Sequence, residues 1–378
     1  MLFRSGGVGL FSGSNNYTVE SNAICGNHSA EYGGAVSAFG YNALGGKITH
    51  NRIWFNASYD EGGGVMIAGE LPADPTQLAE GSGPVTIDAN VIQANLANDD
   101  GGGVRLLQTS GSHISRANPE TIAITNNTIA NNVSAHEGGG LALDDAAFVN
   151  VVNNTVARNI TTATAVTSNG QPAPAGLSTG ANSDPLQARL SNTTVFPGSS
   201  TLASTLFSKP TLLNDVFWDN RAGSFNGVES GITATDANAW DMGAADGSGL
   251  LSPINSVIQT TVGTDASPTN TVGVDPKFVA PFDVAVNILQ LRTYPAFRQA
   301  VIVALILPPN LLGDYHLLNS TSPAYGLGAA STLVRWGPGT SGWTYTVTAA
   351  TPDIDGNNRP SGSGTNRRYD AGSDQFQP

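Results

Sequence analysis

Hydrophobic and polar positions recur between residues 19 and 159 in a fixed nine-residue pattern. An aliphatic residue is followed by an asparagine three positions later, a second aliphatic residue two positions after that, and a second asparagine three positions further on. Five copies keep this order, at 19–27, 48–56, 87–95, 124–132 and 151–159, and a degraded sixth follows at 214–219. Such self-similarity is typical of repeat architectures, in which each unit buries its apolar face against its neighbours.

A glycine element follows the second asparagine in four of the copies. It begins six positions after that asparagine, at Gly33, Gly62, Gly101 and Gly138, and leads into an aliphatic residue. The spacing between copies varies by roughly ten residues, because two repeats carry insertions at 69–84 and 108–120. The repeat therefore keeps its register while its loops change in length.

Short runs such as 65–67 and 104–106 alternate aliphatic residues with others, which predicts strands with one face in a core and one in solvent. Glycine triplets and frequent asparagine weaken a helix at every repeat, whereas tight corners need residues that tolerate positive φ. Parallel strands stacked about 4.8 Å apart place the first asparagine of each copy above the next, where side-chain amides can bond one another. We predict an all-β right-handed parallel β-helix with loop insertions. Its structural ladder comprises Asn22, Asn51, Asn90, Asn127 and Asn154.

The regular pattern predicts a β-helix over 1–260 and a C-terminal closing segment over 261–378. The stretch from about 161 to 210 is rich in Ala, Thr, Ser and Pro, so we expect an irregular excursion there, with repeats resuming near Leu212.

Composition limits the partners and the location of the chain. Charged residues make up 12% of it, and 16 Lys and Arg stand against 29 Asp and Glu, a formal charge of −13. No basic stripe exists to displace the counterions of a phosphate backbone, so nucleic acid is excluded as a partner. The only cysteine, Cys25, is predicted to be a small core residue rather than a nucleophile.

The chain shows neither a signal peptide nor a membrane span. Residues 1–7 lack a charged and apolar leader. The longest apolar run, 300–307, is far shorter than the ~20 residues that cross a bilayer. We expect either a fragment of a longer exported protein or export by another route.

The repeats and several C-terminal segments resemble known families. The Ile-x-x-Asn repeats, Phe217-Trp-Asp-Asn220 and the Gly-Gly-Ala-Val of 33–36 resemble polymorphic-membrane-protein repeats and other β-helical surface passengers. Segments 274–279, 313–317, 322–324, 353–360 and 369–376 resemble the closing segment of secreted bacterial, pectin-lyase-like β-helix proteins with a choice-of-anchor end. The resemblance implies a secreted or cell-surface protein and leaves its activity open.

The residue pairs just before each glycine element carry the candidate chemistry. In a stacked fold one column contains Glu31, Asp60, Asp99 and His136, and the adjacent column contains Tyr32, Glu61, Asp100 and Glu137. We call these two columns the acidic columns. Like charges stacked opposite one another are destabilising unless something neutralises them.

Three interpretations of the acidic columns stay open, and solvated turn carboxylates are the simplest. The second is a calcium site formed by Asp60, Glu61, Asp99 and Asp100, since hard cations take several oxygen ligands. The third is catalysis by Asp99, Asp100 and His136.

Other residues bear on these alternatives. Arg105 is the nearby basic residue, and a surface arginine that balances the columns is favoured over a catalytic base. Asp99-Asp100 looks like the Asp pair of polygalacturonase-type β-helices, but their Gly-His-Gly and Arg-Ile-Lys signatures are absent. The two insertions are expected to form a wall beside the columns. The turn at Asp353, Asp355 and Asn357 is interpreted as an aspartate turn without metal.

The sequence thus predicts an extracellular or cell-surface module for adhesion or glycan contact. Glu31, Asp60, Glu61, Arg105 and Glu137 are its candidate ligand-binding residues, and a polysaccharide or host-cell glycan is the expected partner. Two alternatives are a polysaccharide lyase or glycoside hydrolase acting in a groove, and a purely structural spacer.

Overall fold

The computed structural model describes residues 6–74, 76–197, 203–226, 238–265, 267–291, 294–303, 312–336, 343–362 and 367–377. Three parts of the predictions lie outside these residues. They are the first five positions, which belong to the predicted absence of a leader, residues 304–307 at the end of the longest apolar run, and residues 198–202 of the predicted irregular excursion.

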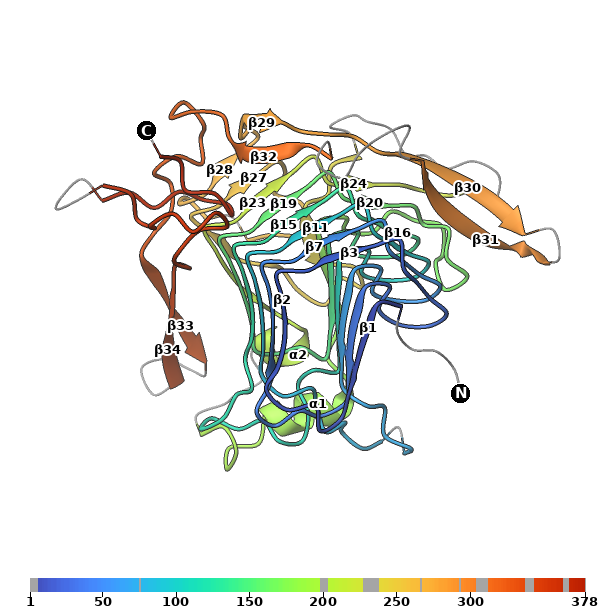
Figure 1. Cartoon of the computed structure of the whole chain (residues 1–378). Helices are drawn as coiled ribbons and strands as arrows, with labels where there is room; N and C mark the ends of the chain where they lie inside the picture. The colour runs from blue at the N-terminus through green and yellow to red at the C-terminus, as the bar shows by residue number, and fades with distance from the viewer. Residues whose placement is uncertain are drawn as a thin grey trace.

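The described chain winds through four all-parallel sheets, named A to D here, and so forms a right-handed parallel β-helix (Figure 1). One strand of each sheet makes one coil, as in β5 to β8. Sheet A contains β1 (Val8–Phe11), β5 (Val36–Phe39), β9 (Val65–Ala68), β13 (Val104–Leu107), β17 (Leu141–Asp144), β21 (Leu177–Thr179) and β25 (Met242–Ala244). Sheet B contains β2 (Tyr17–Glu20), β6 (Gly46–Thr49), β10 (Val85–Asp88), β14 (Ile122–Thr125), β18 (Val149–Val152), β22 (Thr211–Leu213) and β26 (Pro253–Ile254).

The other two sheets hold the shorter strands. Sheet C contains β3 (Ala23–Cys25), β7 (Arg52–Trp54), β11 (Val91–Gln93), β15 (Thr128–Ala130), β19 (Thr155–Ala157), β23 (Val216–Trp218), β27 (Val257–Ile258) and β28 (Thr271–Val272). Sheet D contains β4 (His28–Ser29), β8 (Ala57–Ser58), β12 (Leu96–Ala97), β16 (Val133–Ser134), β20 (Ile160–Thr161) and β24 (Arg221–Ala222). The fold class is therefore the one predicted.

The predicted asparagine ladder is present and lies at the corner between sheets B and C. The Asn90 amide donates to Asn127 Oδ1 at 2.9 Å, and that of Asn127 donates to Asn154 Oδ1 at 3.0 Å. The ladder ends on the buried carboxylate of Asp215. A second ladder at the corner between sheets C and D runs through Asn27, Asn56, Asn95, Asn132, Asn159 and Asn220 and ends on Asp241.

Two predictions about side-chain direction are wrong. Cys25 is exposed rather than in the core, because Ile24 before it takes the inward position of β3 and alternation turns the thiol outward. The outward residues of sheet A, Met66 and Arg105, are buried rather than solvated. The outer face of sheet A is therefore shielded from solvent at Met66 and Arg105, next to the acidic columns.

Segment 161–210 contains both loops and regular elements. Its strand β21 continues sheet A, and its helices α1 (Asp184–Leu190) and α2 (Ala203–Leu206) lie at the end of the coils drawn lowest in Figure 1. The loop 162–176 joins β20 of sheet D to β21 of sheet A, and so follows the same path as the acidic pairs of earlier coils.

From residue 275 onward the chain leaves the coils and packs on their outside. It forms the pair β29 (Phe278–Ala280) and β32 (Asp314–Leu317) and two hairpins, β30 (Ala285–Leu291) with β31 (Tyr294–Val303) and β33 (Ser331–Trp336) with β34 (Trp343–Thr348). Hairpin β30–β31 extends away from the coils in Figure 1, whereas β33–β34 packs against them through Trp336 and Trp343, whose rings contact Phe148. No helix in the part of the chain that the structure describes is long and apolar enough to cross a membrane.

Outward-facing asparagines attach this C-terminal segment to the coils. Asn126, Asn153 and Asn214 adopt positive φ at the B–C corner, which turns their side chains away from the core ladder. Their amides donate to the backbone carbonyls of Pro352, Asp370 and Ala329. Each corner thus has two uses, since the residue that follows the outward asparagine, Asn127, Asn154 or Asp215, belongs to the internal ladder.

Candidate functional site

The acidic columns lie in the turns that lead from sheet D to sheet A, with the register that the sequence predicted. Asp99 N–H donates to the carbonyl of Asp60 at 3.0 Å, and His136 N–H donates to that of Asp99 at 3.2 Å. The glycine after each pair has positive φ, as at Gly101 with 71°. An added Cβ on the next glycine, Gly102, would lie 2.4 Å from the carbonyl oxygen of Val133. Glycine is therefore required both for the turn and for the close approach of the coils.

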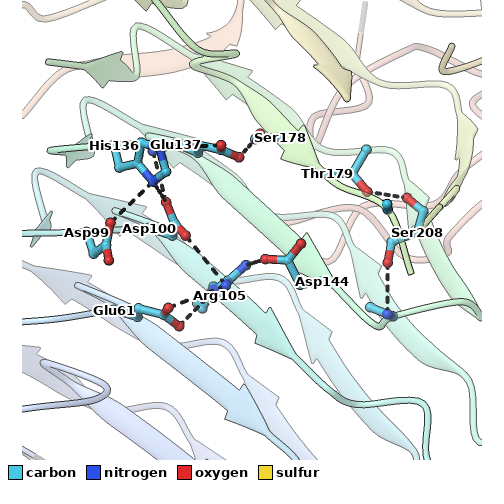
Figure 2. A network of polar contacts seen from close by, with 12 residues as sticks. Glu61, Asp99, Asp100, Arg105, His136, Glu137, Asp144, Ser178, Thr179 and Ser208 are labelled. Atoms are coloured by element: carbon cyan, nitrogen blue, oxygen red, sulfur yellow. Dashed lines mark hydrogen bonds and ion pairs between the residues drawn. The ribbon is translucent and has the colours of Figure 1, made fainter. Parts of the chain in front are cut away.

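Arg105 lies beside the second acidic column, which contains Glu61 and Asp100, and neutralises it. Its guanidinium lies 2.9 Å from Glu61 Oε2, 3.5 Å from Asp100 Oδ2 and 2.5 Å from Asp144 Oδ2 (Figure 2). The prediction of a surface arginine is corrected, because the residue is only 3% exposed, whereas its predicted pairing with the acidic columns is confirmed. Burial opposes its charge, but the three carboxylates outweigh that effect and raise its pKa.

His136 connects the two columns. Its Nδ1 lies 3.3 Å from Asp99 Oδ1 and 3.1 Å from Asp100 Oδ1, while Nε2 lies 3.6 Å from Glu137 Oε1. Burial acts to lower the pKa of the imidazole, but the hydrogen bonds to Asp100 and Asp99 prevail and raise it to about 10. At neutral pH this group is therefore an imidazolium that holds carboxylates together, and it is a poor general base.

Three carboxyl groups of the columns have raised pKa values, and burial is the largest cause in each. The pKa of Asp60 is raised to about 6, with Asp99 and Glu31 adding repulsion. That of Glu61 is raised to about 7 in spite of Arg105. That of Glu137 is also raised to about 7, although it accepts a hydrogen bond from Ser178 Oγ at 2.8 Å. These groups exchange protons near neutral pH.

The structure brings together only part of the proposed calcium site. Among the described residues, one potential ligand group with atoms within 4.8 Å of one another is Asp99, Asp100 and His136, and Asp60 and Glu61 do not belong to it. Glu61 and Asp100 already face Arg105. Calcium there would have to share its carboxylates with fixed positive charges, and its binding stays a prediction.

The wall beside the columns comes from a different loop than predicted. The insertions 69–84 and 108–120 follow β9 and β13, whereas the acidic pairs precede those strands. Four-residue strands separate the two places by about 13 Å. The adjacent loop is 162–176, whose Thr167 Oγ1 donates to Asp99 Oδ1 at 2.7 Å.

This loop and the columns enclose a hollow of about 270 Å³. We call it the column hollow, and its lining residues are Ala30, Tyr59, Asp60, Asn98, Asp99, Ala165, Val166 and Thr167. Tyr59 is 42% exposed, and the Asn98 amide is buried with neither side-chain atom hydrogen-bonded within the described structure. The hollow thus combines an accessible ring, two carboxylates and an amide with unused hydrogen-bonding capacity.

Several members of this site escaped the sequence analysis. Asp144 and Ser178 lie on the outer face of sheet A, and strand register would have aligned Asp144 with Leu107 and Ser178 with Ala142. Asn98 and Tyr59 lie one position before the acidic columns and share a column with each other. Thr167 carried no signal, because its loop belongs to no repeat.

Comparison with family models, with curated proteins and with solved structures finds no match to this chain. The fold is therefore defined by the chain's own strand order and register. The resemblance to choice-of-anchor and pectin-lyase-like proteins stays a prediction.

Proposed function

We propose that the chain is an extracellular or cell-surface β-helical module that binds a neutral glycan in the column hollow. The observation that carries this proposal is the chemistry of the hollow's lining. The exposed Tyr59 ring can stack on the apolar face of a sugar. Asp60 and Asp99 can accept hydrogen bonds from hydroxyl groups, and charged acceptors make the strongest such bonds.

The buried amide of Asn98 adds a donor and an acceptor for the same ligand. A buried polar group without a partner destabilises the fold unless water or a ligand bonds it. A volume of about 270 Å³ accommodates one or two sugar rings at the edge of a longer chain. The carboxylates and the net charge of −13 disfavour acidic polysaccharides.

Catalysis by Asp99, Asp100 and His136 is the second candidate function, because the three side chains lie in contact. The imidazolium character of His136 disfavours it as the base of a lyase. We therefore expect binding without cleavage.

The test is affinity electrophoresis of the whole chain in gels that contain neutral polysaccharides or polygalacturonate. Wild type should be retarded by a neutral polysaccharide, and Tyr59→Ala should weaken that retardation at least tenfold. Phe11→Ala is the matched control, since this ring is 55% exposed on β1, away from the hollow. Retardation by no neutral polysaccharide, or equal retardation of both variants, would contradict the proposal.

The same mixtures should be assayed for bond cleavage. A lyase leaves an unsaturated product that absorbs in the ultraviolet, whereas a hydrolase leaves only new reducing ends. Turnover that is lost in Asp99→Ala/Asp100→Ala would replace the binding function by the enzymatic one.

A further inference from the structure

A second group of ionisable side chains lies where the C-terminal segment crosses sheet C, outside the acidic columns. Strand β32 supplies His316, the turn after residue 353 supplies Asp355, and Asp374 comes from near the C-terminal end. One nitrogen or oxygen atom of each lies within 4.8 Å of those of the other two. Only the folded chain brings these three segments together.

The imidazole of His316 is oriented from both sides. Its Nε2 lies 2.8 Å from Asp355 Oδ2, and its Nδ1 contacts Asp314 Oδ1. A histidine that binds a metal through one ring nitrogen almost always donates the other N–H to a carboxylate or carbonyl. Asp314 occupies that supporting position, which leaves Nε2 directed toward Asp355.

Asp374 is held in place by the backbone beside the ring. Its Oδ2 accepts a hydrogen bond from Leu317 N–H at 2.9 Å, and the residue is only 7% exposed. A buried carboxylate that is fixed one residue from the imidazole loses little freedom on binding an ion. Within the described structure, Asp314 and Asp355 form ion pairs with His316 alone, whereas Asp374 also attracts the buried guanidinium of Arg359.

We propose that His316, Asp355 and Asp374 bind one divalent transition-metal ion of the zinc type. One imidazole nitrogen and two carboxylate oxygens match the ligands that zinc takes, whereas calcium prefers oxygen ligands alone. Metal–ligand bonds of about 2.1 Å set tetrahedral ligand atoms about 3.4 Å apart. Asp355 Oδ2 therefore has to move about 0.6 Å away from Nε2, and a pair of ligand atoms at the 4.8 Å limit has to close by about 1.4 Å. The ion replaces the proton shared between His316 and Asp355.

An open hollow adjoins two of the three ligands, His316 and Asp355. Its volume is about 380 Å³, and His50, Arg52 and Gln93 line the wall opposite β32. This space leaves coordination positions for water or a small ligand. The group of Asp99, Asp100 and His136 is less suited to a metal ion. Its Asp100 is already paired with the Arg105 guanidinium, which repels a cation.

This proposal is independent of glycan binding and is tested with zinc alone. Isothermal titration of the whole chain in buffer with calcium should give one zinc ion per chain. His316→Gln should weaken zinc binding at least tenfold, and Asp314→Asn by 10- to 100-fold, as loss of the supporting carboxylate does. His136→Gln is the matched control and should bind zinc like wild type.

A second measurement on the wild-type chain does not depend on how the variants fold. Of its five histidines, one imidazole should show a stoichiometric NMR response to zinc, assigned to His316 by comparison with the variants. Absence of zinc binding by wild type, or equal affinity in His316→Gln, would overturn the proposal. Loss of binding in His136→Gln would move the ion to the acidic columns.

Discussion

Replacement of Asn127 by alanine should destabilise the fold through the internal ladder. The Asn127 amide donates to Ile87 O at 2.8 Å and to Asn154 Oδ1 at 3.0 Å. Its oxygen accepts the N–H and the side-chain amide of Asn90, both at 2.9 Å. Asn127 is fully buried, so water cannot replace these bonds.

The size of the effect follows from these contacts. Four hydrogen bonds at a net 0.5–1.5 kcal/mol each amount to about 4 kcal/mol. The Asn90 side chain keeps its bond to Ile48 O, whereas its backbone N–H loses its acceptor. A buried donor without a partner costs about 1–3 kcal/mol, and the four-bond sum already contains that cost.

The end of the same ladder provides the control. Asn22 is exposed on the first coil and donates only to Glu20 O and Asn51 Oδ1 among the described contacts, so Asn22→Ala should cost about 1 kcal/mol. Denaturant unfolding followed by far-ultraviolet circular dichroism gives both midpoints and slopes. Equal losses in Asn22→Ala and Asn127→Ala would refute the argument that buried amide bonds, rather than the residue type, set the cost.

The remaining predictions concern calcium and pH. Calcium binding by Asp60, Glu61, Asp99 and Asp100 predicts that millimolar calcium raises the melting temperature of wild type but not of Asp99→Asn/Asp100→Asn, because only the folded columns hold the ion; an identical response would place the ion elsewhere. Burial raises the pKa of Asp241 to about 7, so the folded chain keeps a proton that the unfolded chain loses near pH 4. The stability from this group is therefore present below about pH 4 and is lost as the pH rises to 7, a change of about 4 kcal/mol. Asp241→Asn should remove that slope from the pH dependence of the unfolding free energy, and parallel curves for the two proteins would contradict the assignment.

Part of the candidate site followed from the repeat itself. Strand stacking converts a sequence register into spatial columns, so Asp99, Asp100 and His136 were predicted to be neighbours and are in contact. The register also pairs Arg105 with Ala142, next to the strand end that carries Asp144. The register did not predict that Arg105 is buried, because its burial depends on how the turns before sheet A fold back over that sheet.

The sequence by itself determined the coil, its ladders and its tight turns. These depend on neighbours at fixed spacing, such as the asparagine pairs and the glycines before sheet A, and local pattern is sufficient to specify them. Only the tertiary structure decided which loop borders the columns and how the C-terminal segment packs. Thr167 reaches Asp99, and His316 reaches Asp355, across separations that no repeat fixes. Those contacts form because the coils present an outer surface, and the non-repeating segments that follow them in the chain pack on it.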